Sequence, residues 1–478
     1  MLKGLEIIEV NLSKAIENKD LRIDSDFWTK EPRKNSKLKY EKIGALLKKS
    51  QYGISISMNG DKIGYPIYRM NEIHNMMCDL NVDKYADISK DEFEKFKLND
   101  RDVLFNRTNS YEWVGRTGIY RKTNEQEFIF ASYLVRFVPD EKIINPEYLI
   151  AYLNTKYGER EIKRRARRSI NQTNVNPEEV KEIYIPLLCK KIQNFIKNVF
   201  SKAHAYRLKS DDMINSAKTL LLETIGLKNF TPNAKAICVK NFKNSYHQTG
   251  RLDAEYYQCK YENLLTHITA CPHSKLLDLV SIQKSIEPGS DAYTNDENGI
   301  PFLRVADYDK FNINKPQKKL GTSFVSKNCL KLKTLKPKKE TILFSKDGSI
   351  GQAYCLRRDA DFITSGAILH LRIKDHAKLL PDYLTLVLNS KIVQMQAERD
   401  AGGSIIVHWR VSEIKNTVIP LVDLNTQSQI SSLIQESFAL KAESERLLNV
   451  AKQAVEMAIE QDEESATKWI QEQLKVDQ

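Results

Sequence analysis

The chain has 478 residues, of which 41% are hydrophobic and 28% are charged. This composition is ordinary for folded globular protein and excludes wholesale disorder, and the length is sufficient for two or more domains. The formal net charge of +12 favours a polyanionic partner, with nucleic acid the first candidate, although a solvated basic surface would give the same count.

The cysteines and the hydrophobic runs bear on the compartment of the protein. The seven cysteines are scattered, odd in number and never spaced as Cys-x-x-Cys, so we expect neither a disulfide framework nor a zinc ribbon. The first residues, Met1 to Glu6, lack an apolar signal core, and no apolar run approaches membrane-spanning length. The sequence therefore predicts a protein of the reducing cytoplasm that has no contact with a membrane.

The order of landmarks that begins at Arg22 returns once, beginning at Arg251. The matching stretches, first copy before second, are 22–28 with 251–257, 64–69 with 299–304, and 146–156 with 381–391. This repetition predicts two copies of one domain in a single chain.

Each copy has the same sequence of predicted elements. A strand-like apolar run, a glycine loop, a second strand-like run, a helix that begins with proline and a closing Ile-Pro follow one another. In the first copy these are 102–105, 115–118, 128–130, the helix from Pro146 and 185–186; in the second they are 341–344, 348–351, 362–364, the helix from Pro381 and 419–420. Short strands mixed with one or two helices predict an α+β domain.

A long helix with heptad spacing is predicted after each copy. Small and apolar residues alternate at spacings of four and three from Ile196 to Thr224 and from Ile430 to Ala458, with no internal glycine or proline. The simplest burial of two such seams in one chain is an antiparallel, coiled-coil-like pair. The alternative is two separate helices, each packed on its own domain. We thus predict a first domain at 1–188, a helix at 189–228, a second domain at 229–422, and a second helix with the C-terminal tail at 423–478.

These motifs resemble the specificity subunit of Type I restriction-modification systems, over nearly the whole chain. The resemblance depends on the Arg-Leu-Asp-Ala-Glu-Tyr-Tyr opening at 251–257, the Gly-Ile-Pro-Phe-Leu-Arg element at 299–304, and the repeated Ile-Pro followed by a helix start that contains glutamine. The first copy departs from this pattern, with a looser opening at 24–28 and a helix start that reads Lys190-Lys191-Ile192-Gln193.

The resemblance implies a non-catalytic protein that reads a two-part sequence in double-stranded DNA. Each target recognition domain is expected to read one half-site. The helix pair is expected to set the gap and to dock adenine methyltransferase subunits, which supply S-adenosylmethionine, while separate restriction and translocase subunits use ATP. No cofactor or metal is expected in this chain itself.

The densest basic run, and the polar residues after it, form the first candidate DNA surface. Cations that hold phosphates and amide side chains that reach base edges are the two kinds of contact that DNA reading needs. The candidates are Lys163, Arg164, Arg165, Arg167 and Arg168, followed by Asn171, Gln172 and Asn174. We expect the run to continue the preceding helix and to spread its charges around a helical surface; a solvated helix end is the alternative.

The matching stretch of the second copy is less basic. Its candidates are Ser404, His408 and Arg410, of which the arginine has the geometry to pair with guanine. His408 has no companions at metal-ligand spacing. Trp409 is equally compatible with a core position and with a DNA contact.

The loop after the first strand-like run forms another candidate surface in each copy. Its candidates are Arg107 and Asn109 in the first copy and Lys346 and Ser349 in the second, although such polar residues are also common turn formers. Arg69 and Arg304 occupy matching positions. Because two different half-sites would not share a base reader, a phosphate contact or a structural ion pair is favoured for both.

Motifs of catalysis are missing from the sequence. It contains no Asn-Pro-Pro-Tyr or Asp-Pro-Pro-Tyr tetrapeptide, no glycine-rich cofactor loop after a strand and no Gly-x-x-x-x-Gly-Lys-Ser/Thr phosphate loop. We therefore predict no catalytic residue. Two alternatives stay open: a nuclease or methyltransferase with an unrecognised active site, which would be active as the purified chain, and a structural scaffold, which would bind DNA only weakly.

Overall fold

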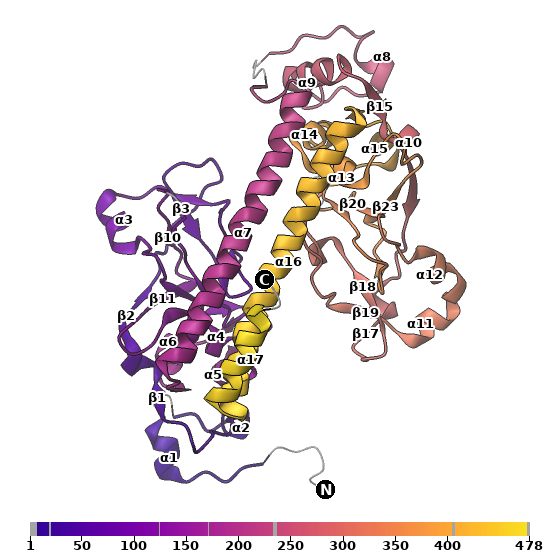
Figure 1. Ribbon diagram of the computed structural model, residues 1–478. Helices are drawn as coiled ribbons and strands as arrows, with labels where there is room; N and C mark the ends of the chain where they lie inside the picture. The colour runs from indigo at the N-terminus through magenta and orange to yellow at the C-terminus, as the bar shows by residue number, and fades with distance from the viewer. Residues whose placement is uncertain are drawn as a thin grey trace. The chain divides into compact units, whose positions relative to one another are not determined.

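The computed structural model describes residues 7–18, 21–123, 125–170, 172–232, 237–403 and 407–475. The chain divides into two compact units, Met1–Arg207 with Lys441–Gln478, and Leu208–Leu440. Both units mix helices with short strands, which confirms the predicted α+β class (Figure 1). Each unit contains part of both long helices, α7 (Lys190–Thr224) and α16 (Leu424–Glu460).

The first unit contains these further elements. Its helices are α1 (Leu12–Glu17), α2 (Ser25–Thr29), the 3₁₀ helix η1 (Ile43–Leu46), α3 (Lys90–Phe96), α4 (Pro146–Leu153), α5 (Lys156–Arg165), α6 (Pro177–Lys181) and α17 (Glu463–Lys475). Its strands are β1 (Tyr40–Lys42), β2 (Leu47–Tyr52), β3 (Tyr65–Tyr68), β4 (Ile73–His74), β5 (Met77–Cys78), β6 (Tyr85–Ala86), β7 (Val103–Asn106), β8 (Thr108–Asn109), β9 (Thr117–Ile119), β10 (Ile129–Phe130), β11 (Leu134–Pro139), β12 (Arg167–Arg168), β13 (Thr173–Asn174) and β14 (Tyr184–Pro186).

A six-stranded sheet in the order β2-β11-β7-β9-β5-β4 organises the first unit. Strand β7 is central because all four of its residues are buried, and it pairs antiparallel with β11 on one side and β9 on the other. Such a continuous apolar run is expected of a strand covered on both faces. The smaller sheets are β10-β3-β6, β12-β13-β8 and β1-β14.

The second unit contains a similar set of elements. Its helices are α8 (Tyr246–Thr249), α9 (Cys259–Thr269), α10 (Leu276–Leu279), η2 (Ser290–Ala292), η3 (Val305–Asp307), α11 (Thr322–Lys327), α12 (Cys329–Leu335), α13 (Pro381–Asn389), α14 (Lys391–Asp400) and α15 (Val411–Lys415). Its strands are β15 (His273–Lys275), β16 (Val280–Lys284), β17 (Tyr293–Thr294), β18 (Ile300–Leu303), β19 (Lys318–Leu320), β20 (Ile342–Ser345), β21 (Ala353–Cys355), β22 (Ile363–Thr364), β23 (Ile368–Ile373) and β24 (Val418–Pro420).

Two four-stranded sheets, β16-β23-β20-β21 and β17-β19-β18-β22, form the second unit together with the pair β15-β24. Strand β20 is fully buried and lies between β23 and β21, as β7 lies between β11 and β9 in the first unit. The residues just before these two strands, Arg101 and Glu340, both have a positive φ, of 69° and 65°. Non-glycine residues seldom adopt this conformation, so its occurrence before both strands marks the same turn.

Each proline-led helix is joined to the closing Ile-Pro strand by a buried tyrosine. In the first unit, the Tyr148 hydroxyl of α4 donates to the carbonyl of Pro186. In the second, the Tyr383 hydroxyl of α13 donates to the carbonyl of Pro420 at 2.8 Å. A buried hydroxyl needs such a partner, and here the partner is the strand that leads directly into a long helix.

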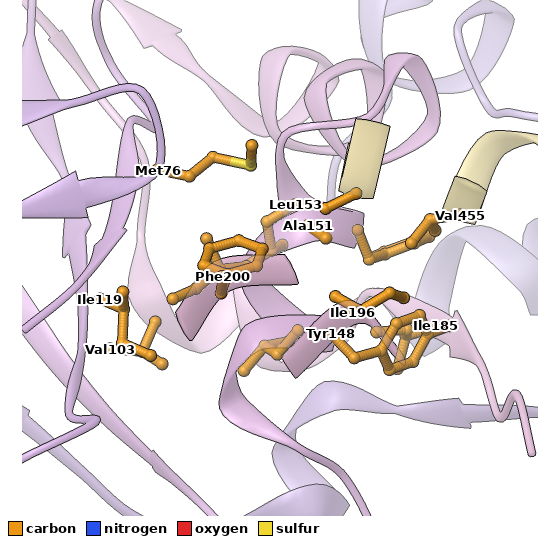
Figure 2. Close-up of a cluster of buried hydrophobic side chains, with 14 of the residues drawn as sticks. Met76, Val103, Ile119, Tyr148, Ala151, Leu153, Ile185, Ile196, Phe200 and Val455 are labelled. Carbon is orange, nitrogen blue, oxygen red and sulfur yellow. The ribbon is translucent and has the colours of Figure 1, made fainter. Parts of the chain in front are cut away.

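In the first unit, the N-terminal part of α7 packs against the C-terminal part of α16 and against the domain core. Figure 2 shows Ile196 and Phe200 of α7 beside Tyr148 of α4 and Val455 of α16. The Ser444 hydroxyl donates to the carbonyl of Ala203 at 2.8 Å, so small side chains allow a close approach of the two helices. The buried seam on α7 consists of Ile192, Ile196, Val199, Phe200 and Ala203.

In the second unit, the remaining parts of α7 and α16 also share a core. Ile214, Ala217 and Leu221 lie in one cluster with Ile430 and Ile434. The buried residues on α7 are Ile214 and Leu221 rather than the neighbouring Met213 and Leu220, which are half-buried. An α-helix has 3.6 residues per turn, so a strict heptad stripe drifts around a straight helix, which accounts for the displacement.

A buried glutamine in the first turn of each long helix connects it to the rest of its unit. The Gln193 side chain accepts from the backbone N–H of Asn145 at 2.9 Å and donates to the carbonyl of Leu188 at 2.8 Å. The Gln427 side chain accepts from the N–H of Leu380 at 3.0 Å and donates to the carbonyl of Val422 at 2.9 Å. Both side chains thus satisfy backbone groups that would otherwise be buried without partners.

One cysteine pair departs from the expectation drawn from the sequence. Cys238 and Cys259 form a disulfide, with their Cα atoms 5.9 Å apart. The scattered spacing of the cysteines gave no sign of this pair, because the contact depends on how residues 237–258 fold back onto the start of α9.

Across the ranges that the structure describes, no helix combines the length and the apolar character that crossing a membrane requires. The two long helices, α7 and α16, instead carry charged residues throughout.

Candidate nucleic-acid interface

In the first unit, the two candidate surfaces predicted separately from the sequence come together in one small sheet. Strand β12 contains Arg167 and Arg168 and pairs with β13, which in turn pairs with β8 in the loop after the central strand. The register places Asn174 opposite Thr108 and Thr173 opposite Asn109. Backbone pairing therefore holds cations and short polar side chains on neighbouring strands.

A glycine allows the loop after β8 to lie against α5. Gly115 has a φ of +89°, and a Cβ atom at this position would lie 2.4 Å from Cγ2 of Ile162. In the second unit, Gly351 has a φ of +74° and a Cβ there would lie 2.8 Å from Nε2 of Gln394 on α14. In each unit, the predicted glycine loop thus lies against the helix, α5 or α14, that leads into the other candidate stretch.

The basic run divides at the end of α5, and this corrects the predicted continuous helix. The helix ends at Arg165, and Ala166 is extended, so the chain enters β12 instead of continuing the helix. The positions before this break face inward, whereas Arg167 and Arg168 are exposed.

Arg164 and Arg165 are buried, each with about 5% of its surface exposed. The Arg164 guanidinium donates to Oε2 of Glu161 at 2.9 Å and to the carbonyl of Phe27 at 2.8 Å. Arg165 donates to the carbonyls of Glu179 and Glu161, both at 3.0 Å, and also pairs with the Glu161 carboxylate. Their charges are compensated inside the unit, which argues against the predicted DNA contacts.

Lys163 also has a structural role in the unit. Its ammonium donates to three backbone carbonyls of the loop: those of Glu112 at 3.1 Å, Val114 at 3.0 Å and Tyr111. Burial lowers the pKa of Lys163. All three of its hydrogens are used, so it contributes charge to the site rather than a free donor.

Arg167 and Arg168 are the exposed cations of the run. Arg167 pairs with Glu179 at 3.1 Å, and 53% of its side chain remains exposed. The Arg168 guanidinium lies 3.7 Å from the centre of the Tyr111 ring, in cation–π geometry. Stacking of this kind fixes the side chain while leaving its N–H groups available at the surface.

The polar candidates near this sheet lie in different settings. The Asn174 side chain accepts from the Thr108 hydroxyl at 2.5 Å, and the Asn109 side chain accepts from the N–H of Ser110 at 2.8 Å. Both asparagines are half-buried and keep amide N–H groups for further contacts. Gln172 is exposed, and Asn171 lies outside the described residues.

Arg107 is held at the base of the same loop. Its guanidinium lies 5.2 Å from the ring centre of Tyr52, and its Nε is buried and makes no hydrogen bond. Its backbone N–H donates to the carbonyl of Tyr133 at 3.0 Å. Arg107 is therefore half-buried beside the loop instead of projecting from its tip.

The second unit brings its two candidate stretches together by isolated backbone pairs. Asp347 pairs with His408, the N–H of Trp409 donates to the carbonyl of Lys346 at 2.8 Å, and the N–H of Gly348 donates to that of Val407 at 2.9 Å. The loop after β20 and the stretch after α14 thus form one surface, as their counterparts do in the first unit.

A carboxylate lies at the centre of this second surface. Asp347 accepts from Nδ1 of His408 at 2.8 Å and pairs with the Lys346 ammonium. Ser349 is exposed, and Ser404 lies outside the described residues. The partly compensated charge makes this surface less cationic than the first.

Trp409 and Arg410 have opposite environments. Trp409 is 1% exposed and its ring centre lies 5.7 Å from that of Phe344, so the core alternative is confirmed. Arg410 is exposed at the N-terminal end of α15, where its guanidinium can reach a partner.

The Arg-x-Asp openings of the repeat lie at these surfaces. Arg22 pairs with Asp24 at 2.6 Å and donates to the carbonyl of Arg165 at 3.3 Å. Arg251 pairs with Asp253 and donates to the carbonyl of Asp400 at 2.9 Å. The hydrogen bond from Arg22 lowers the pKa of Asp24, and the hydrogen bond from Arg251 lowers the pKa of Asp253 in the same way.

Sequence reasoning used these openings only as landmarks, yet they fix the chain where a helix ends and the candidate surface begins. It also missed Tyr111. The signal for that residue was the aromatic pair Tyr111 and Trp113 directly after the polar loop, with Trp113 stacked on Arg116 at 3.5 Å.

The matched arginines of the two copies form ion pairs within each unit. Arg69 pairs with Glu72 three residues on, and Arg304 pairs with Asp307 at 3.1 Å in the same arrangement. Of the two roles favoured from the sequence, these contacts support the structural one.

The described part of the chain contains no group of three or more histidine, cysteine, aspartate or glutamate side chains that could hold a metal ion. What the two surfaces offer chemically is hydrogen bonding and positive charge.

Comparison with known proteins finds a matching family and two curated relatives. The family described as Type I restriction modification DNA specificity domain matches residues 273–452. The chain is 26% identical over 264 residues to the protein described as the type I restriction enzyme MjaX specificity subunit of Methanocaldococcus jannaschii, covering 54% of this chain and 57% of that protein. It is 33% identical over 84 residues to the type I restriction enzyme EcoKI specificity subunit of Escherichia coli K12, covering 17% and 18%. The chain thus spans less than two thirds of the length of these curated relatives.

Two solved specificity subunits align with most of this chain, at low identity and low TM-scores. The Type I restriction-modification S subunit from M. genitalium aligns over 93% of this chain and 97% of its own, at 12% identity and a TM-score of 0.35. The HsdS subunit from Thermoanaerobacter tengcongensis aligns over 90% and 98%, at 14% identity and a TM-score of 0.29. The domain match and the curated relatives confirm the resemblance to Type I specificity subunits that the sequence motifs predict.

Proposed function

We propose that this chain is the DNA-recognition subunit of a Type I restriction-modification complex, in which each unit reads one half of a two-part site. The observation that carries the proposal is the pairing of β8 with β13 in the first unit and of Asp347 with His408 in the second. In both, backbone pairing joins a polar loop to a second polar stretch. The family match over residues 273–452 supports the same role.

The two units are proposed to be copies of one target recognition domain. Support comes from contacts that recur at matched positions: the Arg-x-Asp openings, the tyrosines that bind the Ile-Pro strands, and the helix-start glutamines. The candidate surfaces themselves differ, since Arg167 and Arg168 have no basic counterpart at Gly402 and Gly403. Two different half-site sequences are expected from this difference.

The helices α7 and α16 are proposed to form an antiparallel, coiled-coil-like pair that sets the gap between the half-sites. In each unit, part of α7 and part of α16 already share a buried seam. In this scheme the predicted ranges 1–188 and 229–422 are the target domains, and 189–228 and 423–478 contain the spacer helices and the tail.

The chain is proposed to catalyse nothing by itself and to act with partners in the cytoplasm. Adenine methyltransferase subunits would dock on it to modify the site, and restriction and translocase subunits would complete the complex. The site residues proposed to contact DNA are now Asn109, Arg167, Arg168, Gln172 and Asn174 in the first unit, and Ser349, His408 and Arg410 in the second.

Co-expression with the methyltransferase tests this proposal. The chain is expected to co-purify with it, and the complex is expected to methylate adenine when S-adenosylmethionine is added, whereas the chain alone with magnesium or S-adenosylmethionine should neither cut nor methylate DNA. Activity of the isolated chain would favour an unrecognised active site. A complex with no sequence preference would favour a scaffold.

A further inference from the structure

A surface pocket of about 220 Å³ lies beside β12 in the first unit. Its wall is formed by the opening motif, by the loop after β8 and by the end of the basic run. The side chains and residues that line it are Arg22, Asp24, Asp26, Lys30, Tyr111, Lys163, Ala166, Arg167 and Arg168. Five cationic and two anionic side chains meet here, so the lining has an excess of positive charge.

Three of these cations have an acidic partner nearby. Arg22 pairs with Asp24 at 2.6 Å, Lys30 pairs with Asp26 at 2.5 Å, and Arg167 pairs with Glu179 at 3.1 Å. In each pair, the carboxylate compensates the charge of the cation. The net positive charge of the pocket therefore comes from the other two cations.

Among the described residues, Lys163 and Arg168 form no salt bridge with a carboxylate. Both lie over the same ring: the Lys163 ammonium is 5.0 Å and the Arg168 guanidinium 3.7 Å from the centre of Tyr111. The Lys163 ammonium donates its hydrogens to backbone carbonyls. The Arg168 guanidinium is stacked on the ring, and its N–H groups stay available as donors. One side chain therefore supplies the charge, and the other supplies the hydrogen bonds.

We propose that this pocket holds a backbone phosphate of the DNA that the first unit reads, bound by Arg168 with the charge of Lys163 behind it. An arginine whose plane is fixed by stacking presents two parallel N–H groups to a phosphate, and the phosphate supplies the negative charge that the pocket lacks. The inference rests on the proposed DNA-reading function and adds a particular contact to it.

The position of the pocket selects DNA over a free anion as the source of the phosphate. In the register of the sheet, Arg168 lies opposite Thr173, and the next pair of opposite residues is Asn174 and Thr108. A phosphate bound at Arg168 would place the adjoining nucleotides beside the amide side chains that are proposed to read bases. Phosphate contacts fix register in this way without reading sequence themselves.

The contact should exist at one half-site only. In the second unit, the residues after α14 are Ala401, Gly402 and Gly403, and Arg399 is engaged by Asp400 at 2.7 Å. No stacked, uncompensated arginine occupies the matching place among the residues described there. The two half-sites are therefore expected to differ in their dependence on backbone charge.

Single methylphosphonate substitution, which removes the charge of one phosphate, tests the proposal. A duplex with the recognised site is scanned one phosphate at a time for binding to the methyltransferase complex of the wild-type chain, of Arg168→Met, and of Arg33→Met as a control, since Arg33 is exposed and does not line the pocket. We expect one position in the first half-site where substitution weakens the wild type and the control by roughly threefold to tenfold but leaves Arg168→Met unaffected.

Salt dependence gives a second measurement. Arg168→Met is expected to reduce the slope of log K against log salt by about 0.9, the value for one phosphate, on any sequence. Equal phosphate profiles for Arg168→Met and the wild type would overturn the proposal while leaving the DNA-reading function intact. A second pair of results would also overturn the proposal: inorganic phosphate raises the thermal stability of the wild type but not of Arg168→Met, and the methylphosphonate scan shows no sensitive position. The pocket would then hold a free anion instead of a DNA phosphate. Absence of DNA binding by the wild-type complex would instead contradict the proposed function.

Discussion

Five cations that are neighbours in the sequence have different environments, because α5 ends between them. Arg164 and Arg165 are buried and bound to Glu161, whereas Arg167 and Arg168 lie on an exposed strand. Composition alone makes the whole run look like one phosphate clamp. Burial separates the part that holds the fold from the part that can reach DNA.

Substitutions of a buried arginine and of an exposed arginine in this run should therefore differ in their effect on the free energy of unfolding. Arg165→Met removes one of the two buried arginines that bind Glu161 and leaves the carbonyl of Glu179 without its side-chain donor, so it should lower the free energy of unfolding by about 2–4 kcal/mol. Arg168→Met, at an exposed position, should change it by less than about 0.5 kcal/mol. Urea denaturation of the two variants compares these values directly. Equal stability of the two would show that the buried pairing is not formed.

A buried histidine gives the second unit a pH dependence. His370 on β23 is fully buried, and its Nε2 lies 2.8 Å from the Thr364 hydroxyl. Burial, followed by the charge of Arg372, lowers the pKa of His370 from 6.5 to about 4. Between these two values the unfolded chain binds a proton that the folded chain does not, so stability is complete above pH 6.5 and is lost as the pH falls toward 4.

His370→Gln, which keeps a donor or acceptor for Thr364, should reduce this acid sensitivity. On going from pH 7 to pH 5, the wild type should lose about 2 kcal/mol more of unfolding free energy than the variant. Urea titrations at the two pH values give this difference. The same loss in both proteins would mean that His370 is protonated, or exposed, in the folded chain.

At the scale of elements, the sequence predicted where the helices and strands lie along the chain better than it predicted which strands pair. The buried strands β7 and β20, the proline-led helices and the two long helices lie where apolar runs and heptads placed them. What joins the elements could not be read in this way. The pairing of β8 with β13 links residues far apart in the chain through two-residue strands, which leave no periodic pattern.

The end of α5 was missed for a related reason. Lys163 to Arg168 is uniformly basic, so helix and strand residues in the run have the same composition, and no glycine or proline marks the break at Ala166. The buried partners Glu161 and Phe27 that pull Arg164 inward become visible only when the helix is packed.

The glutamine at the start of each long helix should matter more than its exposed neighbours. Gln427→Ala leaves the N–H of Leu380 and the carbonyl of Val422 buried without partners, so we expect a loss of about 2–4 kcal/mol of unfolding free energy. Gln429→Ala, at an exposed position two residues further along α16, is the matched control and should be nearly neutral. Thermal and urea unfolding of both variants measure the effect; a neutral Gln427→Ala would indicate that water replaces the side chain.

At the scale of the whole chain, the proposed function requires two DNA-reading surfaces that differ in chemistry. The first has exposed arginines and half-buried asparagines on a three-stranded sheet, and the second has a carboxylate bound by histidine and lysine. The matched landmarks were visible in the sequence because they are structural residues. The two surfaces were less predictable, because their residues differ between the copies.

Selection of bound sequences from a random DNA library, with the methyltransferase complex of the wild-type chain and of an Asn109→Ala, Asn174→Ala variant, tests the central claim most directly. We expect the wild type to select two short blocks at a constant gap, and the variant to relax one block while keeping the other and the gap. Selection of a single continuous block, or a change in both blocks on altering the first unit alone, would contradict two independent reading units in one chain.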